Sequence, residues 1–203
     1  MKYNKILSIS SFIVAFISLA TYSIFGYVGC IQNTYIKDIS LAVFGSALLL
    51  LVSSIVGYFI EKKHLQEEIL GLTYEWNTAT DIYYEIKDNG ISLNSIVRLL
   101  DNSYHKLLLL HSKMRMYSQG LFKKDKELKN IICDLRPFEE YLTNFTVLLR
   151  HPNYNPQKIS TEINTLLEKE NALNERLSNW MKTSKFEMGE DFNINVPEEK
   201  ENV

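Results

Sequence analysis

The residue types that most often carry catalysis or bind metals are sparse in this sequence and poorly spaced for either purpose. The four histidines lie at positions 64, 105, 111 and 151, and His105 and His111 are six residues apart, on poorly aligned faces of a helix. The sequence lacks the His-Glu-x-x-His zinc motif, the phosphate-binding Gly-x-x-x-x-Gly-Lys-Ser/Thr loop, and the Gly-x-Gly-x-x-Gly and Gly-x-Ser-x-Gly motifs. We therefore predict no metal, no cofactor and no enzymatic activity.

The remaining reactive side chains are better explained by structure than by chemistry. A nucleophilic Cys133 needs a positioned base, and the sequence offers none. Cys30 lies beside an apolar segment and Cys133 lies in a charged one, so an internal disulfide is not expected. His111 falls on an apolar helical line, which favours a packed, hydrogen-bonded histidine over a metal ligand.

A local excess of basic residues is the clearest candidate for binding chemistry. Between positions 113 and 129 the net charge is +4, and Tyr117 and Phe122 are interleaved with the basic residues. Such a segment suits anionic lipid or the phosphates of a nucleoprotein partner, and the alternative is an ordinary solvated helix face. The candidate partner-binding residues are Lys113, Arg115, Lys123, Lys124, Lys126 and Lys129.

The charges of the chain are unevenly distributed, which indicates two unlike parts. Of the 22 basic and 24 acidic residues, only Lys2, Lys5, Lys37 and Asp38 lie in residues 1–60. Uncharged apolar runs cover residues 6–28 and 39–60, and a membrane-spanning helix needs about 20 such residues. We predict a transmembrane hairpin over 1–60, a helical bundle over 61–185 and an acidic disordered tail over 186–203.

The lysines predict how this hairpin is oriented. Lys2 and Lys5 precede the first run and Lys62 and Lys63 follow the second, whereas the connecting turn has one Lys and one Asp. By the positive-inside rule both ends face the cytoplasm, giving a multi-pass protein of the bacterial inner membrane. A cleaved signal peptide is the weaker alternative, because the first apolar run is longer than a signal core of 7–15 residues.

Small residues recur along one face of each predicted span. In lipid, helices associate through close backbone contact, so these positions are candidates for packing within the hairpin or for lining a polar path between copies. The candidates for hairpin packing or a pore are Ser11, Ala15, Ser18, Ser46, Ser53 and Gly57. The runs contain no Asp, Glu, Lys, Arg or His, which disfavours a proton relay or an ion-coupled transporter.

The remainder of the chain has the apolar period of helices, so the fold class is all-α with an antiparallel bundle and coiled-coil-like seams. The second apolar helix is predicted to continue without a break to Lys87 and to end at Asp88-Asn89-Gly90. Gly120 is predicted to end the next helix, Pro137 to interrupt the following one, and Asn155 with Pro156 to start the last. The predicted seams are Leu65, Ile69, Leu72, Trp76, Ala79, Tyr83 and Ile86; Leu93, Val97, Leu100, Tyr104, Leu107, His111 and Met114; and Ile159, Ile163, Leu166, Glu170, Leu173, Leu177 and Trp180.

This layout resembles the small two-span membrane effectors of bacterial anti-phage defence systems, especially those linked to retrons. The resemblance is in architecture and rests on Ile6–Val28, Ile39–Ile60 and Leu65–Ile86, with no specific motif. It implies a membrane-disrupting toxin, restrained by a cytosolic partner such as a reverse transcriptase with its RNA-DNA product. Release of the restraint would let the hairpins oligomerise or rearrange and permeabilise the inner membrane. The alternative function is a non-toxic membrane-anchored coiled-coil scaffold that binds a partner.

Overall fold

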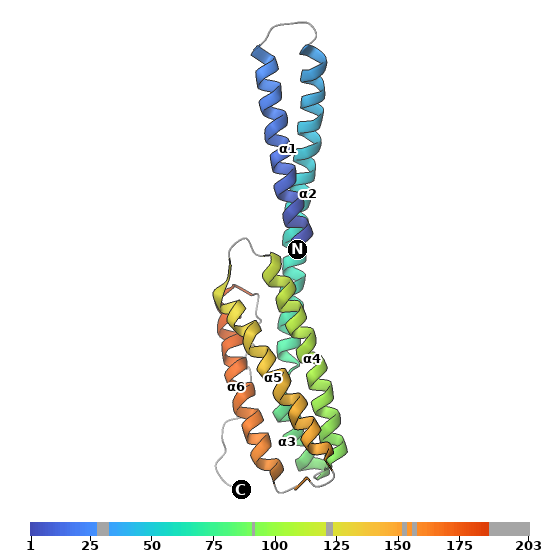
Figure 1. Cartoon of the computed structure of the whole chain (residues 1–203), viewed down its shortest axis with the longest axis vertical. Coiled ribbons are helices and arrows are strands. Elements are labelled where there is room, and N and C mark those ends of the chain that lie inside the picture. Colours follow the sequence, from blue (N-terminus) through green and yellow to red (C-terminus); the bar gives the residue numbers. More distant parts are fainter. Residues whose placement is uncertain (28–32, 91, 121–123, 152–153, 156–157, 187–203) are drawn as a thin grey trace. The chain divides into compact units, whose positions relative to one another are not determined.

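The structure is a computed structural model that describes residues 1–27, 33–90, 92–120, 124–151, 154–155 and 158–186. These residues form helices joined by short turns, with no strand among them, as predicted for an all-α chain. The helices are α1 (Lys2–Tyr27), α2 (Asn33–Tyr74), α3 (Thr78–Asn89), α4 (Leu93–Gly120), α5 (Lys126–Arg150) and α6 (Ile159–Thr183) (Figure 1). The chain divides into an N-terminal unit, residues 1–65, and a C-terminal unit from residue 66 onward, with the division inside α2.

The N-terminal unit is a pair of antiparallel helices, α1 and the first part of α2. Both are long and apolar enough to cross a membrane by length and composition. Their ends are fixed to each other by polar contacts: Asn4 Nδ2 donates to Glu61 Oε2 at 3.1 Å, and the amino group of Met1 pairs with the same carboxylate. Gly57 permits this close approach, since a Cβ there would lie 3.3 Å from Asn4 Nδ2.

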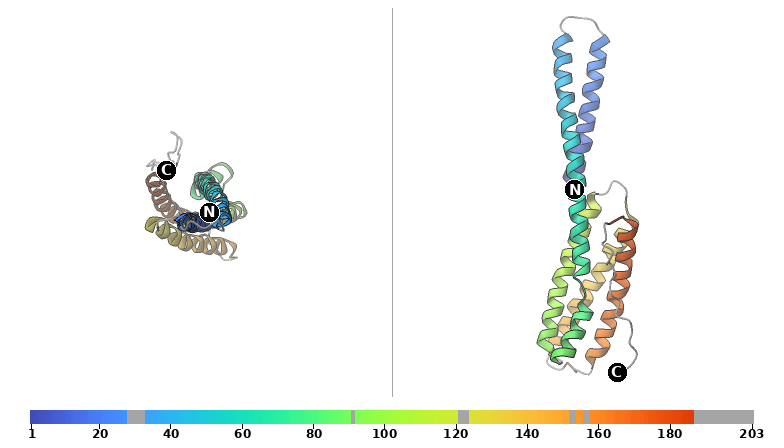
Figure 2. Two further views of the ribbon diagram at one scale, coloured as in Figure 1. Left: turned by 90° about the horizontal axis from the view of Figure 1, so that it is seen from above. Right: turned by 180° about the vertical axis from the view of Figure 1, so that it is seen from behind.

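The C-terminal unit is an antiparallel bundle in which α3 packs on α4 and α6, and α5 packs on α4 and α6. From α3 to α6, consecutive helices alternate in direction (Figures 1 and 2). Arg150 Nη2 bonds Asp101 Oδ2 at 2.6 Å near one end of the α4–α5 pair, and His111 Nδ1 lies 2.6 Å from Glu139 Oε1 farther along it. The core consists of large side chains with no more than 2% of their surface exposed, including Ile69, Trp76, Ile82, Leu107, Leu110, Leu135 and Leu142.

The prediction that the second helix continues to Lys87 is wrong, because α2 ends at Tyr74 and α3 starts at Thr78. The interruption has its own polar partners. Lys106 Nζ donates to the Glu75 carbonyl at 3.0 Å, and the Trp76 indole donates to Ser103 Oγ at 3.1 Å. Because the chain leaves the helix here, the buried face rotates, and Ile82 is fully buried whereas Tyr83 is 59% exposed.

Two other helix signals are confirmed and two are overturned. Asn89 ends α3, with Gly90 at φ +75°, and Gly120 ends α4. Pro137, however, lies inside a continuous α5. Proline costs a helix interior about 3 kcal/mol, but α5 buries seven large apolar side chains, each contributing about 1.5–3 kcal/mol, so packing outweighs the loss. The last helix starts at Ile159, with Lys158 and not Asn155 at its N-cap. Asn155 instead lies in a turn before the helix, where its carbonyl accepts the Lys158 N–H at 3.1 Å. Pro156 lies outside the described residues.

The heptad seam of α4 is displaced from its predicted line. Leu100, Leu107 and Met114 are buried as expected, but Tyr104 and His111 are only half-buried. The buried line alternates intervals of four and three through Ile96, Leu100, Ser103, Leu107, Leu110, Met114 and Tyr117. Both lines share Leu100, Leu107 and Met114. The observed line places the Ser103 hydroxyl where it accepts a hydrogen bond from the Trp76 indole. The α6 seam is confirmed at Ile159, Leu166, Leu173, Leu177 and Trp180, and it also buries Glu170.

Candidate functional site

The inner face of the N-terminal unit contains three of the six predicted packing residues. Ser11, Ala15 and Ser18 of α1 are buried. On α2 the buried small residues are instead Ser40, Ala47 and Ser54, spaced by seven. Ser46 and Ser53 are exposed, so they do not lie on this packed face, and Gly57 is half-buried. The alternative role of these residues, lining a polar path between copies, stays a prediction. A strict interval of seven along α2 was the available signal for the correct face.

Hydroxyl groups join the two helices on this face, toward the end at which Asn4 meets Glu61. Ser8 Oγ and Ser54 Oγ are 3.1 Å apart, and each also lies within hydrogen-bond distance of a carbonyl in its own helix, Asn4 and Leu50. Between helices in an apolar medium such a contact contributes about 0.6 kcal/mol on average. The sequence patterns did not identify Ser8 and Ser54 as partners because each is one of several serines.

The outer face of the N-terminal unit is apolar, and most of the hydroxyls on it are bonded to their own helix. Ser10, Thr21, Ser23 and Ser46 each donate to a carbonyl three or four residues earlier, at 2.9–3.0 Å. Side chains bonded in this way expose little unsatisfied polarity. Large apolar side chains cover the rest, with Leu49, midway along its apolar run, 70% exposed.

A groove of about 460 Å³ lies along one side of this helix pair. Leu7, Ser10 and Val14 line it from α1, and Ala42, Val43 and Ser46 line it from α2. Because its walls are small and apolar residues, the groove is shaped to receive an apolar chain or helix, and it carries no charged group that would bind an ion.

The predicted partner-binding residues are only partly available on the C-terminal unit. Lys113 is engaged, because its Nζ lies 2.7 Å from Glu68 Oε1 on α2. Arg115, Lys124, Lys126 and Lys129 are exposed, and none of the four forms an ion pair with another described residue; Lys123 lies outside the described residues. We use "basic surface" for Lys124, Lys126 and Lys129, at the start of α5.

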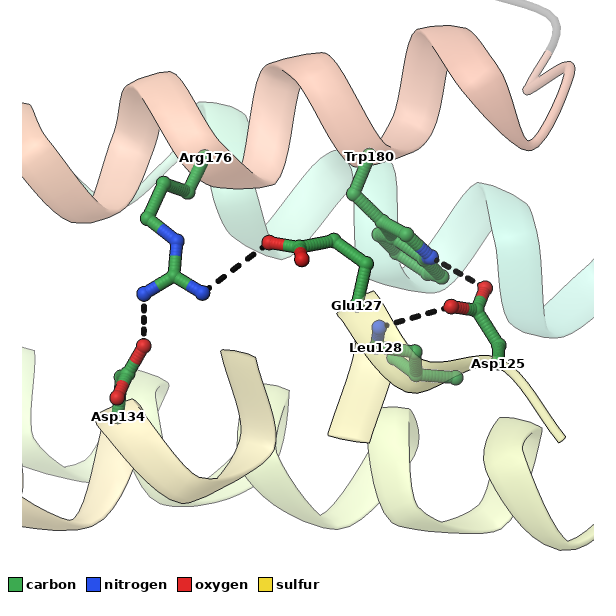
Figure 3. A network of polar contacts seen from close by, with 6 residues as sticks. All are labelled: Asp125, Glu127, Leu128, Asp134, Arg176 and Trp180. Atoms are coloured by element: carbon green, nitrogen blue, oxygen red, sulfur yellow. Dashed lines mark hydrogen bonds and ion pairs between the residues drawn. The ribbon is translucent and has the colours of Figure 1, made fainter. Parts of the chain in front are cut away.

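The two acids within the basic segment are held by internal contacts (Figure 3). Asp125 caps α5 by accepting the Leu128 N–H at 3.0 Å, and its second oxygen accepts the Trp180 indole N–H at 2.9 Å. Glu127 accepts from Arg176 Nη2 at 3.1 Å, and Asp134 pairs with the same guanidinium. The hydrogen bonds and charges of Glu127 and Asp134 raise the pKa of Arg176 above its ordinary value. Arg176 therefore stays charged and paired with these two acids. The lysines of the basic surface therefore have no acid partner in this network.

A buried acid, Glu170, joins α6 to the start of α3. Only 3% of its surface is exposed, and Oε2 accepts the Ala79 N–H at 2.9 Å. It supplies the cap that Asn77 does not, since the Asn77 side chain donates instead to the Tyr74 carbonyl. Burial raises the pKa of Glu170 to about 7, opposed by hydrogen bonds from the Ala79 and Thr78 backbone, while Asp81 raises it further. The sequence places Glu170 in an apolar seam, but it does not reveal that the Ala79 N–H is its hydrogen-bond partner.

The residues considered for catalysis, His111 and Cys133, do not lie together in one site. His111 is half-buried against Glu139, and the thiol of Cys133 is free and exposed. Within the described residues, no group of three or more His, Cys, Asp or Glu side chains is arranged to hold a metal ion. Tyr141, whose hydroxyl donates to the Glu162 carbonyl at 3.1 Å, has its pKa raised to about 12 by burial and by Glu162, so it stays protonated at neutral pH.

Comparisons with known proteins add no relative: no protein-family model matches the chain, and no curated protein or solved structure shows significant similarity to it.

Proposed function

We propose that this protein is a membrane effector whose α1–α2 hairpin lies in a bacterial inner membrane and whose helical C-terminal unit is cytosolic. The observation that carries the proposal is the outer face of the N-terminal unit. It presents large apolar side chains to its surroundings while keeping most hydroxyls bonded within their own helix. That surface is costly in water and suited to hydrocarbon.

The positions of the tyrosines support the same placement. Tyr3 and Tyr58 lie toward one end of the helix pair, and Tyr22, Tyr27 and Tyr35 toward the other, with no Tyr or Trp between them. At 1.5 Å per residue, Tyr3 and Tyr22 are about 28 Å apart along α1, close to the roughly 30 Å thickness of a hydrocarbon core. Tyrosine prefers the two membrane interfaces, where its ring is in lipid and its hydroxyl in water.

The effector activity we propose is permeabilisation of the membrane by several hairpins, under restraint by a cytosolic partner. Within a single hairpin, the hydroxyls of Ser8, Thr21, Ser23, Ser46 and Ser54 are bonded within or between its own helices, so these groups are not available to line a polar path. Conduction therefore requires a homo-oligomer or a rearranged hairpin, and the groove beside Ser46 offers a surface for a second copy. The architecture resembles that of anti-phage effectors, which suggests a protein or nucleoprotein as the restraint.

The proposal is tested by expressing the chain alone in bacteria and measuring membrane potential and growth. We expect depolarisation, and we expect Ala15→Leu to reduce the depolarised fraction about tenfold. Ala15 is buried between the helices, and extra methylenes in a packed site cost about 1–3 kcal/mol. The matched control is Ala20→Leu, the same change on the exposed face of α1, which should behave as the wild type.

The second candidate function, a passive membrane-anchored scaffold, is favoured by the same internally bonded hydroxyls, because they leave the hairpin stable as a single unit. It predicts normal growth and normal potential at high membrane expression, with Ala15→Leu harmless as long as the chain inserts. That result would replace the effector by the scaffold.

A further inference from the structure

Side-chain contacts bring one end of each of four helices together in the C-terminal unit. Gln66 Nε2 on α2 donates to the Tyr117 hydroxyl on α4 at 3.2 Å, and the Tyr117 ring lies 5.9 Å from the Trp180 ring of α6. The Trp180 indole in turn donates to Asp125 at the start of α5. Because Gln66 is the first residue of this unit, the chain enters the unit at this end. We use "entry end" for residues 66–69, 114–120, 124–130 and 177–186.

The entry end exposes basic side chains on three helices. The acids there are largely engaged, since Glu68, Asp125 and Glu127 each accept a hydrogen bond from a side chain on another helix, and the exposed Glu67 is the exception. The basic side chains, in contrast, form no ion pair with any residue that the structure describes. They are Arg115 on α4, the basic surface of Lys124, Lys126 and Lys129 at the start of α5, and Lys182 and Lys185 at the end of α6.

Lys185 occupies a backbone position that usually belongs to glycine. Its φ is +55°, and it follows the last turn of α6, where the Lys185 N–H donates to the Lys182 carbonyl at 3.2 Å. The Phe186 N–H donates to the Met181 carbonyl at 3.1 Å, which completes a helix-terminating motif. Glycine takes this left-handed conformation without strain and lysine does not. The helix end itself therefore gives no reason for a lysine here, which points to a role for its ammonium group outside the fold.

The cations lie on different sides of the entry end, and this distribution indicates the kind of partner. Glu127 faces α6, where it accepts from Arg176. At about 100° per residue, Lys126 and Lys129 are turned 100° or more away from Glu127 around α5, whereas further lysines are on α6 itself. A compact anion or a single peptide would contact one of these sides. A flat layer of phosphate head groups reaches the ends of all three helices together.

We propose that the entry end binds the anionic head groups of the membrane in which the α1–α2 hairpin lies. Gln66 follows Ile60, the end of the second apolar run, by six residues, and six residues span at most about 22 Å. The chain itself therefore keeps the entry end near the lipid surface. Each cation close to an anionic surface strengthens binding about fivefold, and clusters of about four to eight next to a span bind anionic lipid. The proposal rests on the membrane placement proposed above and adds the class of lipid that the C-terminal unit recognises.

The test measures how close the entry end lies to lipid head groups. The full chain, with Cys30→Ser and Cys133→Ser, carries a fluorophore at Gln119→Cys, an exposed and uncharged position at the end of α4. It is reconstituted in nanodiscs that contain a lipid with a nitroxide on its head group. We expect quenching to be several-fold stronger with phosphatidylglycerol present than in phosphatidylcholine alone. This excess should disappear in about 1 M salt, where the Debye length is about 3 Å.

The triple variant Lys126→Gln/Lys129→Gln/Lys182→Gln should remove the excess quenching. The matched control makes the same charge change at exposed positions of the opposite end of the unit and should keep the excess; it is Lys87→Gln/Arg98→Gln/Lys158→Gln. Lys185→Gly separates binding from folding. It should weaken the excess several-fold without lowering the melting temperature, because glycine adopts a positive φ freely.

Equal quenching in the two lipids, or an excess that persists in high salt and in the entry-end triple variant, would overturn the proposal. So would a single-stranded DNA oligonucleotide that binds the wild type but not that variant while no excess quenching occurs, since the entry end would then bind nucleic acid. A chain that does not enter nanodiscs would overturn the membrane placement as well. Because quenching reports a distance to lipid, it is independent of whether the protein permeabilises membranes.

Discussion

Replacing Glu170 by glutamine is expected to raise the free energy of unfolding of the C-terminal unit by about 3 kcal/mol at pH 8 and to leave it nearly unchanged below pH 4.5. The pKa of Glu170 is raised from 4.5 to about 7 in the folded protein, so the folded state holds its proton more tightly than the unfolded state does. Wild-type stability therefore falls as pH rises from 4.5 to 7, by about 1.4 kcal/mol for each unit of pKa difference. Glutamine keeps the oxygen that accepts the Ala79 N–H and removes the ionisation.

The groups around Glu170 do not offset its charge. Asp81 on α3 repels the carboxylate, and Lys106 on α4, the nearby cation, is directed to the Glu75 carbonyl and carboxylate. Both tryptophans, Trp76 and Trp180, belong to the C-terminal unit, so denaturation of the full chain in detergent followed by tryptophan fluorescence reports this unit. The control is Glu168→Gln on the exposed face of α6, which should change stability little at any pH. A Glu170→Gln effect that is the same at pH 4 and pH 8 would contradict the assignment of a raised pKa.

Glu170 also illustrates which features of the fold the sequence could predict. Local signals were sufficient for the two apolar helices, for the stops at Gly90 and Gly120 and for the apolar face of α6. The interruption at residues 75–77 was not predictable, because the groups that satisfy it, Ser103, Lys106 and Glu170, are 25 or more residues away in the sequence. The apolar residues keep their helical spacing across such a break, so the pattern does not reveal that the helix is interrupted.

The candidate sites show the same limit. The basic segment was evident from composition, but the ion pair that engages Lys113 with Glu68 depends on how α2 and α4 pack. Likewise, small residues on α2 suggested Ser46 and Ser53, whereas the packed face runs through Ala47 and Ser54. One residue of displacement turns a helix by about 100°, so a pattern with small residues at adjacent positions does not specify which of them faces the neighbour.

Replacing Leu49 by arginine is expected to prevent insertion of α2 in a large fraction of chains. Leu49 is at the centre of the second apolar run and is 70% exposed on the helix pair. The thirteen Leu, Ile, Val and Phe residues of that run supply a gross insertion drive of roughly 4–8 kcal/mol, and an arginine at the centre costs about 2.5–3.5 kcal/mol in addition to the lost leucine. The substitution thus removes about half of the drive.

The proposed topology, with both ends of the hairpin in the cytoplasm, gives this change a distinctive readout. With α1 inserted and α2 excluded, everything after α2 is left on the external side, so a phosphatase reporter fused behind Val203 should gain activity several-fold. The matched control is Leu109→Arg, the same substitution on a 48% exposed leucine of α4. If that face contacts water, arginine is tolerated there and the reporter stays silent. Equal and silent behaviour of the two variants would mean that the outer face of the α1–α2 pair meets water as well, and the membrane placement would then be wrong.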